Sequence, residues 1–565
     1  MSSQRRDASA AWRLRLVGGL LGLVVFAIGF RLVWLHVVTT ETLKGIGDEI
    51  TIRYETQRAH RGLITDRLGQ PLAVSTPVAA VAVRQKRLTD SAWSEQLGLI
   101  LGMDPERLRA RVAESQLPYI YLSRYVTPER ADQIDALNLD GIEIVRQFRR
   151  FYPAGEVAAH LVGFTNIEDR GQEGLELVFD DWLSGSDGMR HVLKNRRANV
   201  VRYVSAGKEV EQGRELRLSI DLRLQYLTYR ALKEAVARSR ATAGSAVLID
   251  AWTGELLAVA AQPAFNPNDM TSRKPDRVRN RPVSDLMEPG SPIKPFTVAT
   301  ALDVGVVTPD TMVSTSPGRM TIQRKVIRDV RDYGTIDVST VVKKSSNIGS
   351  AKLALMLEPS ELRDRLAMLG FGQSSGLGLS GEADGFLPSF STWRDLDRAV
   401  LSYGYGLMVT PLQLAQAYTV FANDGVLRPV TMLVNGQAPK PVRVFKPETI
   451  RQMLPMLQAV TEQGGTAVNA RIPLYHVGGK TGTTMKLGED GGYASKRYIS
   501  SFVGIAPMDR PRFVMAVVID DPQAQQYYGG QVAAPVFADV MDDVMRLYDV
   551  PPDNPADALL AGGRP

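Results

Sequence analysis

Hydrophobic residues are unevenly distributed along the chain, and the first long apolar run lies close to the N-terminus. From Leu16 to Val38 the sequence is almost entirely apolar, with Arg31 as its one charge. As a helix this run would extend about 35 Å, enough to cross a bilayer. Four arginines precede it: Arg5, Arg6, Arg13 and Arg15. The positive-inside rule therefore predicts a cytoplasmic tail over residues 1–15, an anchor over residues 16–38 and export of the remainder.

A cleaved signal peptide is the alternative interpretation of the same run. It would need a shorter apolar core and a cleavage site of small residues. The sequence VVTTETLKG that follows offers no A-x-A-like site. We therefore expect the run to be retained as a membrane anchor.

Two patterns follow the apolar run, and they divide the exported part near residue 210. Residues 39–210 mix short strand-like runs with polar helical stretches. Residues 211–551 contain longer apolar strands and amphipathic helices, among them a strand pair over 244–263, a hairpin over 500–522 and helices over 222–240 and 534–549. We predict an α/β (α+β) domain there, with an antiparallel sheet flanked by helices. Residues 552–565 are expected to form a disordered tail.

Composition excludes several classes of function. The 565 residues suggest two or three folded units rather than one. The net charge of +6 is diffuse, and its densest cluster, between Arg273 and Arg281, is interpreted as a solvated loop, so no nucleic-acid partner is expected. Without cysteine there is no thiol nucleophile, disulfide or thiolate ligand. The five histidines lack metal-binding spacing, so we expect no metal and no cofactor.

The segment EPGSPIKPF supplies the first pair of reactive side chains. Ser291 precedes the apolar run of a predicted helix, and Lys294 lies three residues further on. This spacing places both side chains on one helix face, one turn apart. A lysine amine whose pKa is lowered by burial or by a nearby cation can accept the proton of a serine hydroxyl. Because a single S-x-x-K can occur by chance, further motifs are needed.

Two further motifs follow in order. KKSSNIGS places Ser345 and Asn347 at the start of another helical run, where on their own they would indicate only a helix cap. HVGGKTGTT contributes Lys480, Thr481, Gly482 and Thr483 on a Gly-rich strand. S-x-x-K, S-x-N and K-T-G in this order form the constellation shared by penicillin-binding proteins and serine β-lactamases. Together the motifs predict a serine acyltransferase with Ser291 as its nucleophile.

Two other motif matches are rejected on structural context. GQSSG (372–376) fits the nucleophile elbow G-x-S-x-G, but that elbow needs a strand before it and a helix after it. Here a helical stretch precedes the match and a non-helical one follows it. GGKT resembles the end of a phosphate-binding loop, but the leading glycine would have to stand at Leu474.

With these residues, the chain resembles a class B penicillin-binding protein over nearly its whole length. RGLITDRLG is similar to the R-G-x-I-x-D-R-x-G signature of that family's non-catalytic domain, and YPAGEVAAHLVGFTN is closer to the division-type (septal) branch, the penicillin-binding protein 3 group, than to the elongation-type branch. The resemblance implies a penicillin-binding/serine β-lactamase-like transpeptidase domain over residues 211–551 and an elongated, dimerisation-like pedestal over residues 39–210. It also implies a peptidoglycan D,D-transpeptidase that cross-links the wall at the septum and is a target of β-lactams.

The resemblance implies a role for each motif residue. Ser291 would be acylated by the penultimate D-Ala of a stem peptide, Lys294 would accept the hydroxyl proton, and Ser345 would relay it to the leaving amine. Lys480 would help to keep the Lys294 amine neutral. The substrate-binding residues would be Asn347, Lys480, Thr481, Gly482 and Thr483. The N–H groups of Ser291 and Thr483 would form the oxyanion hole.

One residue departs from the family pattern. Pro292 follows the nucleophile, where the family more often carries Thr or Ser. Proline fits the first turn of a helix. Its presence raises two questions: whether it alters acylation by different β-lactams, and whether the chain is a housekeeping enzyme or a specialised paralogue. Both questions stay open, as does the identity of the acceptor amine, diaminopimelate or lysine.

Other functions could use the same motifs. A β-lactamase or D-Ala carboxypeptidase would pass the acyl group to water, and an elongation-type transpeptidase would act elsewhere in the wall. A β-lactam sensor would need more signalling sequence than residues 1–15 offer, and a divisome scaffold is the non-enzymatic alternative. The implied location is the bacterial inner membrane, single-pass with a cytoplasmic N-terminus. The implied partners are stem peptides, β-lactams, a membrane glycan polymerase and other division proteins.

Overall fold

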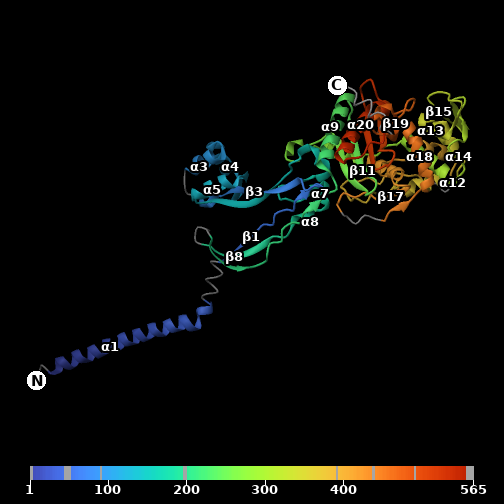
Figure 1. The fold of residues 1–565 in the computed structure, drawn as a ribbon. Helices are drawn as coiled ribbons and strands as arrows, with labels where there is room; N and C mark the ends of the chain where they lie inside the picture. The colour runs from blue at the N-terminus through green and yellow to red at the C-terminus, as the bar shows by residue number, and fades with distance from the viewer. Residues whose placement is uncertain are drawn as a thin grey trace. The chain divides into compact units, whose positions relative to one another are not determined.

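The computed structural model describes residues 4–42, 52–88, 92–194, 200–389, 392–434, 440–488 and 492–554. The chain forms two compact units (Figure 1). Unit 1 comprises Met1–Ala59, Ala79–Gln147 and Gly185–Gln212, and unit 2 comprises His60–Val78, Phe148–Ser184 and Gly213–Pro565. Two segments that precede residue 210 therefore group with unit 2. The predicted division at residue 210 stays a prediction.

Unit 1 begins with the apolar helix. Helix α1 (Gln4–Val33) continues into a π-helical turn, η1 (Trp34–Val38). The apolar span Trp12–Val38 covers most of α1 and all of η1; its most apolar 18-residue window has a mean hydropathy of 2.3, and none of that window is buried against the protein. By length and composition this helix can cross a membrane, as the sequence predicts.

The rest of unit 1 contains two small sheets. In the first, β1 (Ile52–Gln57), β8 (Gly188–Lys194) and β9 (Val200–Ala206) are antiparallel neighbours. In the second, β3 (Pro71–Arg84) pairs with β4 (Tyr119–Val126) and with β5 (Ile142–Phe151). Helices α3 (Trp93–Leu101), α4 (Pro105–Glu114) and α5 (Pro128–Ala136) share a separate hydrophobic core with this second sheet.

The N-terminal segments of unit 2 are held by buried charges. The Glu176 carboxylate accepts from Arg61 Nε at 2.5 Å and from Arg150 Nε at 2.6 Å, and all three side chains are almost completely buried. Arg61 also pairs with Asp180 at 2.6 Å, where the carboxylate is 28% exposed. In the same RGLITDRLG signature, buried Asp66 accepts from the Leu222 N–H at 3.0 Å, at the start of the first long helix of the unit. The signature thus has a structural role.

One five-stranded antiparallel sheet organises unit 2. Its strand order is β12 (Glu255–Gln262), β11 (Ala243–Asp250), β21 (Phe513–Asp520), β20 (Tyr493–Ala506) and β19 (Gly478–Leu487). Helices α9 (Leu222–Ser239) and α20 (Ala534–Leu547) pack on one face, since Gly244 lies against α9 and Gly504 against α20. Helix α17 (Pro411–Tyr418) packs against the same strands from the other face. The prediction of an antiparallel sheet flanked by helices is confirmed.

A mainly helical region completes unit 2 beside β19. Its helices are α12 (Lys294–Val304), α13 (Val338–Lys344), α14 (Asn347–Leu355), α15 (Glu361–Met368), α16 (Asp395–Ser402) and α18 (Pro447–Ala459). Two strand pairs lie among them: β13 (Met312–Ser314) with β16 (Thr335–Asp337), and β14 (Arg319–Ile322) with β15 (Lys325–Arg328). The shorter elements are β2 (Ile64–Thr65), β6 (Phe164–Thr165), β7 (Gly171–Glu173), β10 (Leu216–Arg217), β17 (Val426–Leu427), β18 (Val442–Arg443), α6 (Ala159–Val162), α7 (Gly174–Val178), α8 (Asp180–Ser184), α10 (Pro275–Val278), α11 (Arg281–Ser284) and α19 (Gly529–Val532).

The C-terminal segment is described as far as Asn554. The Asp553 carboxylate accepts from the N–H groups of His476 at 2.6 Å and Met508 at 2.9 Å. Hydrogen bonds therefore hold the first residues of the stretch expected to be a disordered tail. Residues 555–565 of that stretch lie outside the described residues.

We predict that Glu176→Gln destabilises unit 2, because it leaves the buried Arg150 guanidinium without its carboxylate and leaves Arg61 with the partly exposed Asp180 alone. Breaking a buried ion pair by removing one partner typically costs about 3–5 kcal/mol. Thermal and urea unfolding measure the loss. Asp180→Asn is the matched control and should cost less, since Asp180 is partly exposed and, among the described residues, forms an ion pair with one arginine rather than two. Equal effects of the two variants would contradict the assignment of Glu176 as the centre of the network.

Candidate active site

Ser291 stands where an irregular segment turns into a helix. A 3-10 turn, η5 (Ser291–Ile293), leads directly into α12. Gly290 precedes it with a φ of 63°, and a Cβ at that position would lie 2.4 Å from Thr484 Cγ2. Only glycine therefore allows this segment to approach β19 so closely. Pro292 occupies the first turn, as predicted, and its carbonyl accepts from the Tyr418 hydroxyl at 2.7 Å.

The Lys294 amine lies at the centre of the site. Its Nζ is 3.0 Å from Ser291 Oγ, 3.0 Å from Ser345 Oγ and 2.6 Å from the Ser345 carbonyl oxygen. The Ser345 hydroxyl also lies 3.0 Å from Ser291 Oγ. Ser345 reaches this position from the end of α13, where its φ of 60° places it in the left-handed region. The three predicted catalytic residues are thus within hydrogen-bonding distance of one another.

A second buried amine adjoins the first. Lys480 Nζ donates to Ser345 Oγ at 2.9 Å, and both lysines are fully buried. Burial lowers the pKa of Lys294 from 10.5 to about 7, although the charge of Asp329 opposes this. Burial also lowers the pKa of Lys480, and here the charge of Lys294 adds to the effect. The pKa of the Lys294 amine is therefore lowered by exclusion of water, whereas the family resemblance also pointed to the nearby cation Lys480.

Asp329 organises the Ser-Ser-Asn turn, and no short motif marked it in the sequence. Its carboxylate accepts from the Ser346 hydroxyl at 2.5 Å and from the N–H groups of Asn347 at 2.6 Å and Ile348 at 3.1 Å. These N–H groups begin α14, where a carboxylate also interacts favourably with the helix dipole. Asn347 Nδ2 donates to the Arg328 carbonyl at 2.8 Å. Asp329 and its neighbour Arg328 thereby set the position of Asn347.

The K-T-G motif lies on β19, the edge strand of the sheet. A Cβ at Gly482 would lie 2.9 Å from Pro292 Cδ, so glycine permits the strand to pack against the start of the Ser291 turn. Thr481 Oγ1 lies 2.8 Å from Thr466 Oγ1. Thr483 Oγ1 accepts from the Gly529 N–H at 3.1 Å. Because an edge strand keeps free N–H and C=O groups, β19 can pair with an extended peptide.

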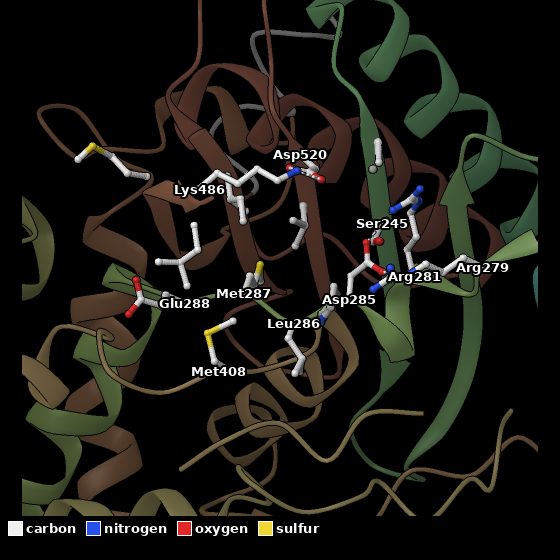
Figure 2. A pocket seen from close by; sticks show the side chains of 17 residues that line it. Ser245, Arg279, Arg281, Asp285, Leu286, Met287, Glu288, Met408, Lys486 and Asp520 are labelled. Carbon is white, nitrogen blue, oxygen red and sulfur yellow. Dashed lines mark hydrogen bonds and ion pairs between the residues drawn. The ribbon is translucent and has the colours of Figure 1, made fainter. Parts of the chain in front are cut away.

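A cavity of about 260 Å³ lies beside the segment that leads to Ser291 (Figure 2). Met287 and Met408 lie on its wall, with the ion pair between Lys486 and Asp520 at one end. At the edge of the cavity, Glu288 accepts from the Gly406 N–H at 3.0 Å and from the Tyr493 hydroxyl at 2.9 Å. Glu288 therefore ties the approach to Ser291 to β20. The sequence motifs did not identify it.

The arrangement suits nucleophilic catalysis by a serine. A hydroxyl within hydrogen-bonding distance of an amine whose pKa is about 7 can lose its proton to that amine near neutral pH. Within the described part of the chain, no three His, Asp or Glu side chains are grouped so that they could hold a metal ion. The predicted site residues lie on the Ser291 turn, at the first residue of α12, on the Ser345–Asn347 turn and on β19.

Comparison with known families gives two matches that together span most of the chain. Residues 244–542 match the penicillin-binding protein transpeptidase domain. Residues 56–218 match the penicillin-binding protein dimerisation domain.

Individual relatives agree with these matches. The chain is 42% identical to peptidoglycan D,D-transpeptidase FtsI of Escherichia coli K12, over 96% of this chain and 93% of that protein. It is 41% identical to probable peptidoglycan D,D-transpeptidase PbpC of Pseudomonas aeruginosa, over 100% and 99%. Among solved structures, the transpeptidase domain of Burkholderia pseudomallei penicillin-binding protein 3 is 43% identical with a TM-score of 0.55, covering 60% of this chain and 97% of that one. Mycobacterium tuberculosis penicillin-binding protein 3 with aztreonam is 28% identical with a TM-score of 0.70, covering 89% and 99%.

We predict that the rate at which a fluorescent penicillin reacts with Ser291 rises with pH through about 7. Because burial lowers the pKa of Lys294 to about 7, its amine is protonated below that pH and cannot accept the hydroxyl proton. Stopped-flow measurement between pH 5 and pH 11 tests this. A rate that rises only above pH 9 would show that Lys294 keeps an ordinary lysine pKa.

We further predict that Asp329→Asn shifts this pH profile toward lower pH. The Asp329 charge raises the pKa of Lys294, so its removal lowers that pKa further. The variant should also lose about 1.5–3 kcal/mol of stability, because it removes hydrogen bonds to a charged acceptor. Asp332→Asn is the matched control, since its carboxylate binds only locally, to Ser316 and Gly334. An unchanged profile in Asp329→Asn would refute the electrostatic link.

Proposed function

This chain belongs to the class B penicillin-binding proteins and is a serine-type peptidoglycan D,D-transpeptidase of the division type, and on that premise we propose that Ser291 carries the acyl-enzyme. The observation that carries this assignment is the position of Ser291 Oγ, 3.0 Å from both Lys294 Nζ and Ser345 Oγ. A nucleophile needs a neighbouring base, and Lys294 is the buried amine beside it.

The acylation step uses three side chains. Ser291 Oγ attacks the carbonyl carbon of the penultimate D-Ala, and its proton passes to the Lys294 amine. The bond to the terminal D-Ala then breaks, and Ser345 relays a proton to the leaving nitrogen. Ser345 suits this role because its Oγ lies within 3.0 Å of Ser291 Oγ and of both lysine amines. The product is an ester between Ser291 and the shortened stem peptide.

The substrate is held along β19. We assign the terminal carboxylate of the donor to Lys480 and Thr481, and its amide to Asn347. The N–H groups of Ser291 and Thr483 would stabilise the oxyanion of the tetrahedral intermediate; in other enzymes one such donor is worth about 2.7–4 kcal/mol. Gly482 supports this arrangement because it lets β19 pack against the Ser291 turn.

Transfer completes the reaction. The side-chain amine of a neighbouring stem peptide attacks the ester carbonyl, its nitrogen loses a proton, and Ser291 Oγ regains one. The new amide bond is the cross-link. A β-lactam imitates the D-Ala-D-Ala end and leaves an acyl group on Ser291.

We also propose the topology and the partners. Arg5, Arg6, Arg13 and Arg15 keep the N-terminus in the cytoplasm, α1 crosses the inner membrane, and the domain that contains Ser291 lies outside the cytoplasm. Residues 39–210 serve as a pedestal for the transpeptidase domain over residues 211–551. The protein partners are a membrane glycan polymerase and other division proteins.

We predict that a fluorescent penicillin labels the full-length chain at Ser291 and that Ser291→Ala abolishes the label. Mass spectrometry locates the adduct, and circular dichroism controls for folding. The variant Ser284→Ala provides the matched control, because Ser284 is a serine outside the predicted motifs and should leave the label unchanged. A label that survives in a folded Ser291→Ala protein would refute the assignment of the nucleophile.

A further inference from the structure

The hairpin of β14 and β15 carries a concentrated positive charge next to the Ser345–Asn347 turn of the active site. Between residues 319 and 332 the chain has five cations and two carboxylates, which is half of the net charge of +6 carried by all 565 residues. The five cations are Arg319, Arg324, Lys325, Arg328 and Arg331, and all five side chains are exposed. We call these five residues the basic hairpin.

The charges of the basic hairpin are not neutralised within the protein. None of its five side chains forms an ion pair with a carboxylate in the part of the chain that the structure describes. The two carboxylates of the segment are engaged elsewhere: Asp329 binds the turn before α14, and Asp332 accepts from the Ser316 hydroxyl at 2.9 Å and the Gly334 N–H at 2.8 Å. An uncompensated positive surface therefore faces solvent.

The register of the hairpin makes this arrangement unfavourable for the protein alone. Arg319 and Arg328 are directly opposite each other in the antiparallel pair. Directly opposite residues project from the same face, and like charges in that position are destabilising. The other face carries Met320 and Ile327, which pack with Ile348 of α14. Packing thus holds the hairpin in place, and a bound anion would relieve the repulsion between the two arginines.

The hairpin is tied directly to the Ser345–Asn347 turn. The Arg328 carbonyl accepts from Asn347 Nδ2, and the next residue, Asp329, accepts from the Asn347 N–H. Strand β15 contacts α14, and both are labelled in the same region of Figure 1. A ligand on the basic hairpin would therefore reach the active site along the wall formed by α14. Apart from Asn347 at its start, which holds the donor amide in the proposed function, this wall is separate from β19, where the rest of the donor binds.

We propose that the basic hairpin is the docking surface for the acyl acceptor, an acidic stem peptide whose carboxylates pair with these cations while its amine reaches the ester on Ser291. The proposal rests on the proposed function, since it concerns the second substrate of the same reaction. Charge complementarity favours this occupant, because stem peptides carry several carboxylates. Such a surface raises the local concentration of an anionic substrate and steers its approach.

The test compares the unmodified full-length chain in detergent with the triple variant Arg319→Gln, Arg324→Gln and Lys325→Gln. A stem peptide ending in D-Ala-D-Ala is the donor, and the measured quantity is the ratio of aminolysis to hydrolysis of the acyl-enzyme. Two acceptors with the same amine are used: an acidic stem peptide and its fully amidated form. The matched control, Arg107→Gln, Arg230→Gln and Arg451→Gln, removes the same charge from exposed positions on other elements.

We expect the triple variant to lower the ratio about tenfold for the acidic acceptor. The amidated acceptor and the rate of Ser291 acylation should be unaffected. Raising the NaCl concentration to 1 M should lower the ratio of the unmodified chain with the acidic acceptor to that of the triple variant, because the Debye length falls to about 3 Å. The proposal would be overturned if the triple variant left the ratio of aminolysis to hydrolysis unchanged. It would also be overturned if the ratio fell equally with the amidated acceptor, or equally in the control variant. A lower rate of acylation by the donor, with an unchanged ratio, would assign the surface to the donor instead and also overturn it.

A second measurement requires no turnover. The chain is first acylated with penicillin, and the affinity of a fluorescent acidic stem peptide for this acyl-enzyme is followed by anisotropy. The triple variant should bind this peptide about tenfold more weakly than the unmodified chain does. In a separate thermal unfolding measurement, Arg319→Thr alone should raise the melting temperature of the protein, because it removes the repulsion from Arg328. Equal affinities would overturn the proposal. Labelling of Ser291 by penicillin tests the proposed function separately, so the two failures are distinguishable.

Discussion

The exclusion of water from the Lys294 amine is the physical condition on which the site depends. An ammonium group in a dry interior is costly, and burial lowers the pKa of Lys294 to about 7. The amine compensates by contacts with Ser291 Oγ, Ser345 Oγ and the Ser345 carbonyl. A residue that would be a solvated cation elsewhere can therefore exist as a neutral amine near neutral pH. The sheet and helices of unit 2 bring this about, because they keep water from a side chain that lies next to the edge strand of the sheet.

Close approach of the backbone makes this burial achievable. Gly290 and Gly482 stand on two different elements, and a Cβ on either would collide with the other wall of the site, with Thr484 in one case and Pro292 in the other. The Ser291 turn and β19 can therefore come together without intervening side chains. The same proximity places the Ser291 turn against the edge strand with which, in the proposed function, the donor pairs.

Two carboxylates hold unit 2 and its site in position, Glu176 fully buried and Asp329 partly buried. Glu176 joins Arg61 and Arg150, which come from segments far apart in the sequence, and Asp329 joins the basic hairpin to the turn before α14. Such groups are costly to bury unless every partner is present, so they favour one arrangement of the chain over its alternatives. Asp329 has two effects, because it orders Asn347 and also acts electrostatically on Lys294. Structure and reactivity are therefore coupled through one side chain.

The sequence by itself determined the features that depend on local pattern. The apolar run at the N-terminus, the strand pairs and the three motifs are each contained in short stretches, where periodicity and residue type suffice to predict helices, strands and the reactive serine. The tertiary structure alone decided the features that depend on distant contacts. Asp329, Glu288 and the basic hairpin belong to no motif, and their roles follow from which groups they meet in the folded chain. The cause of the lowered Lys294 pKa is of the same kind, because burial is a property of the whole packed domain and no short stretch of sequence encodes it.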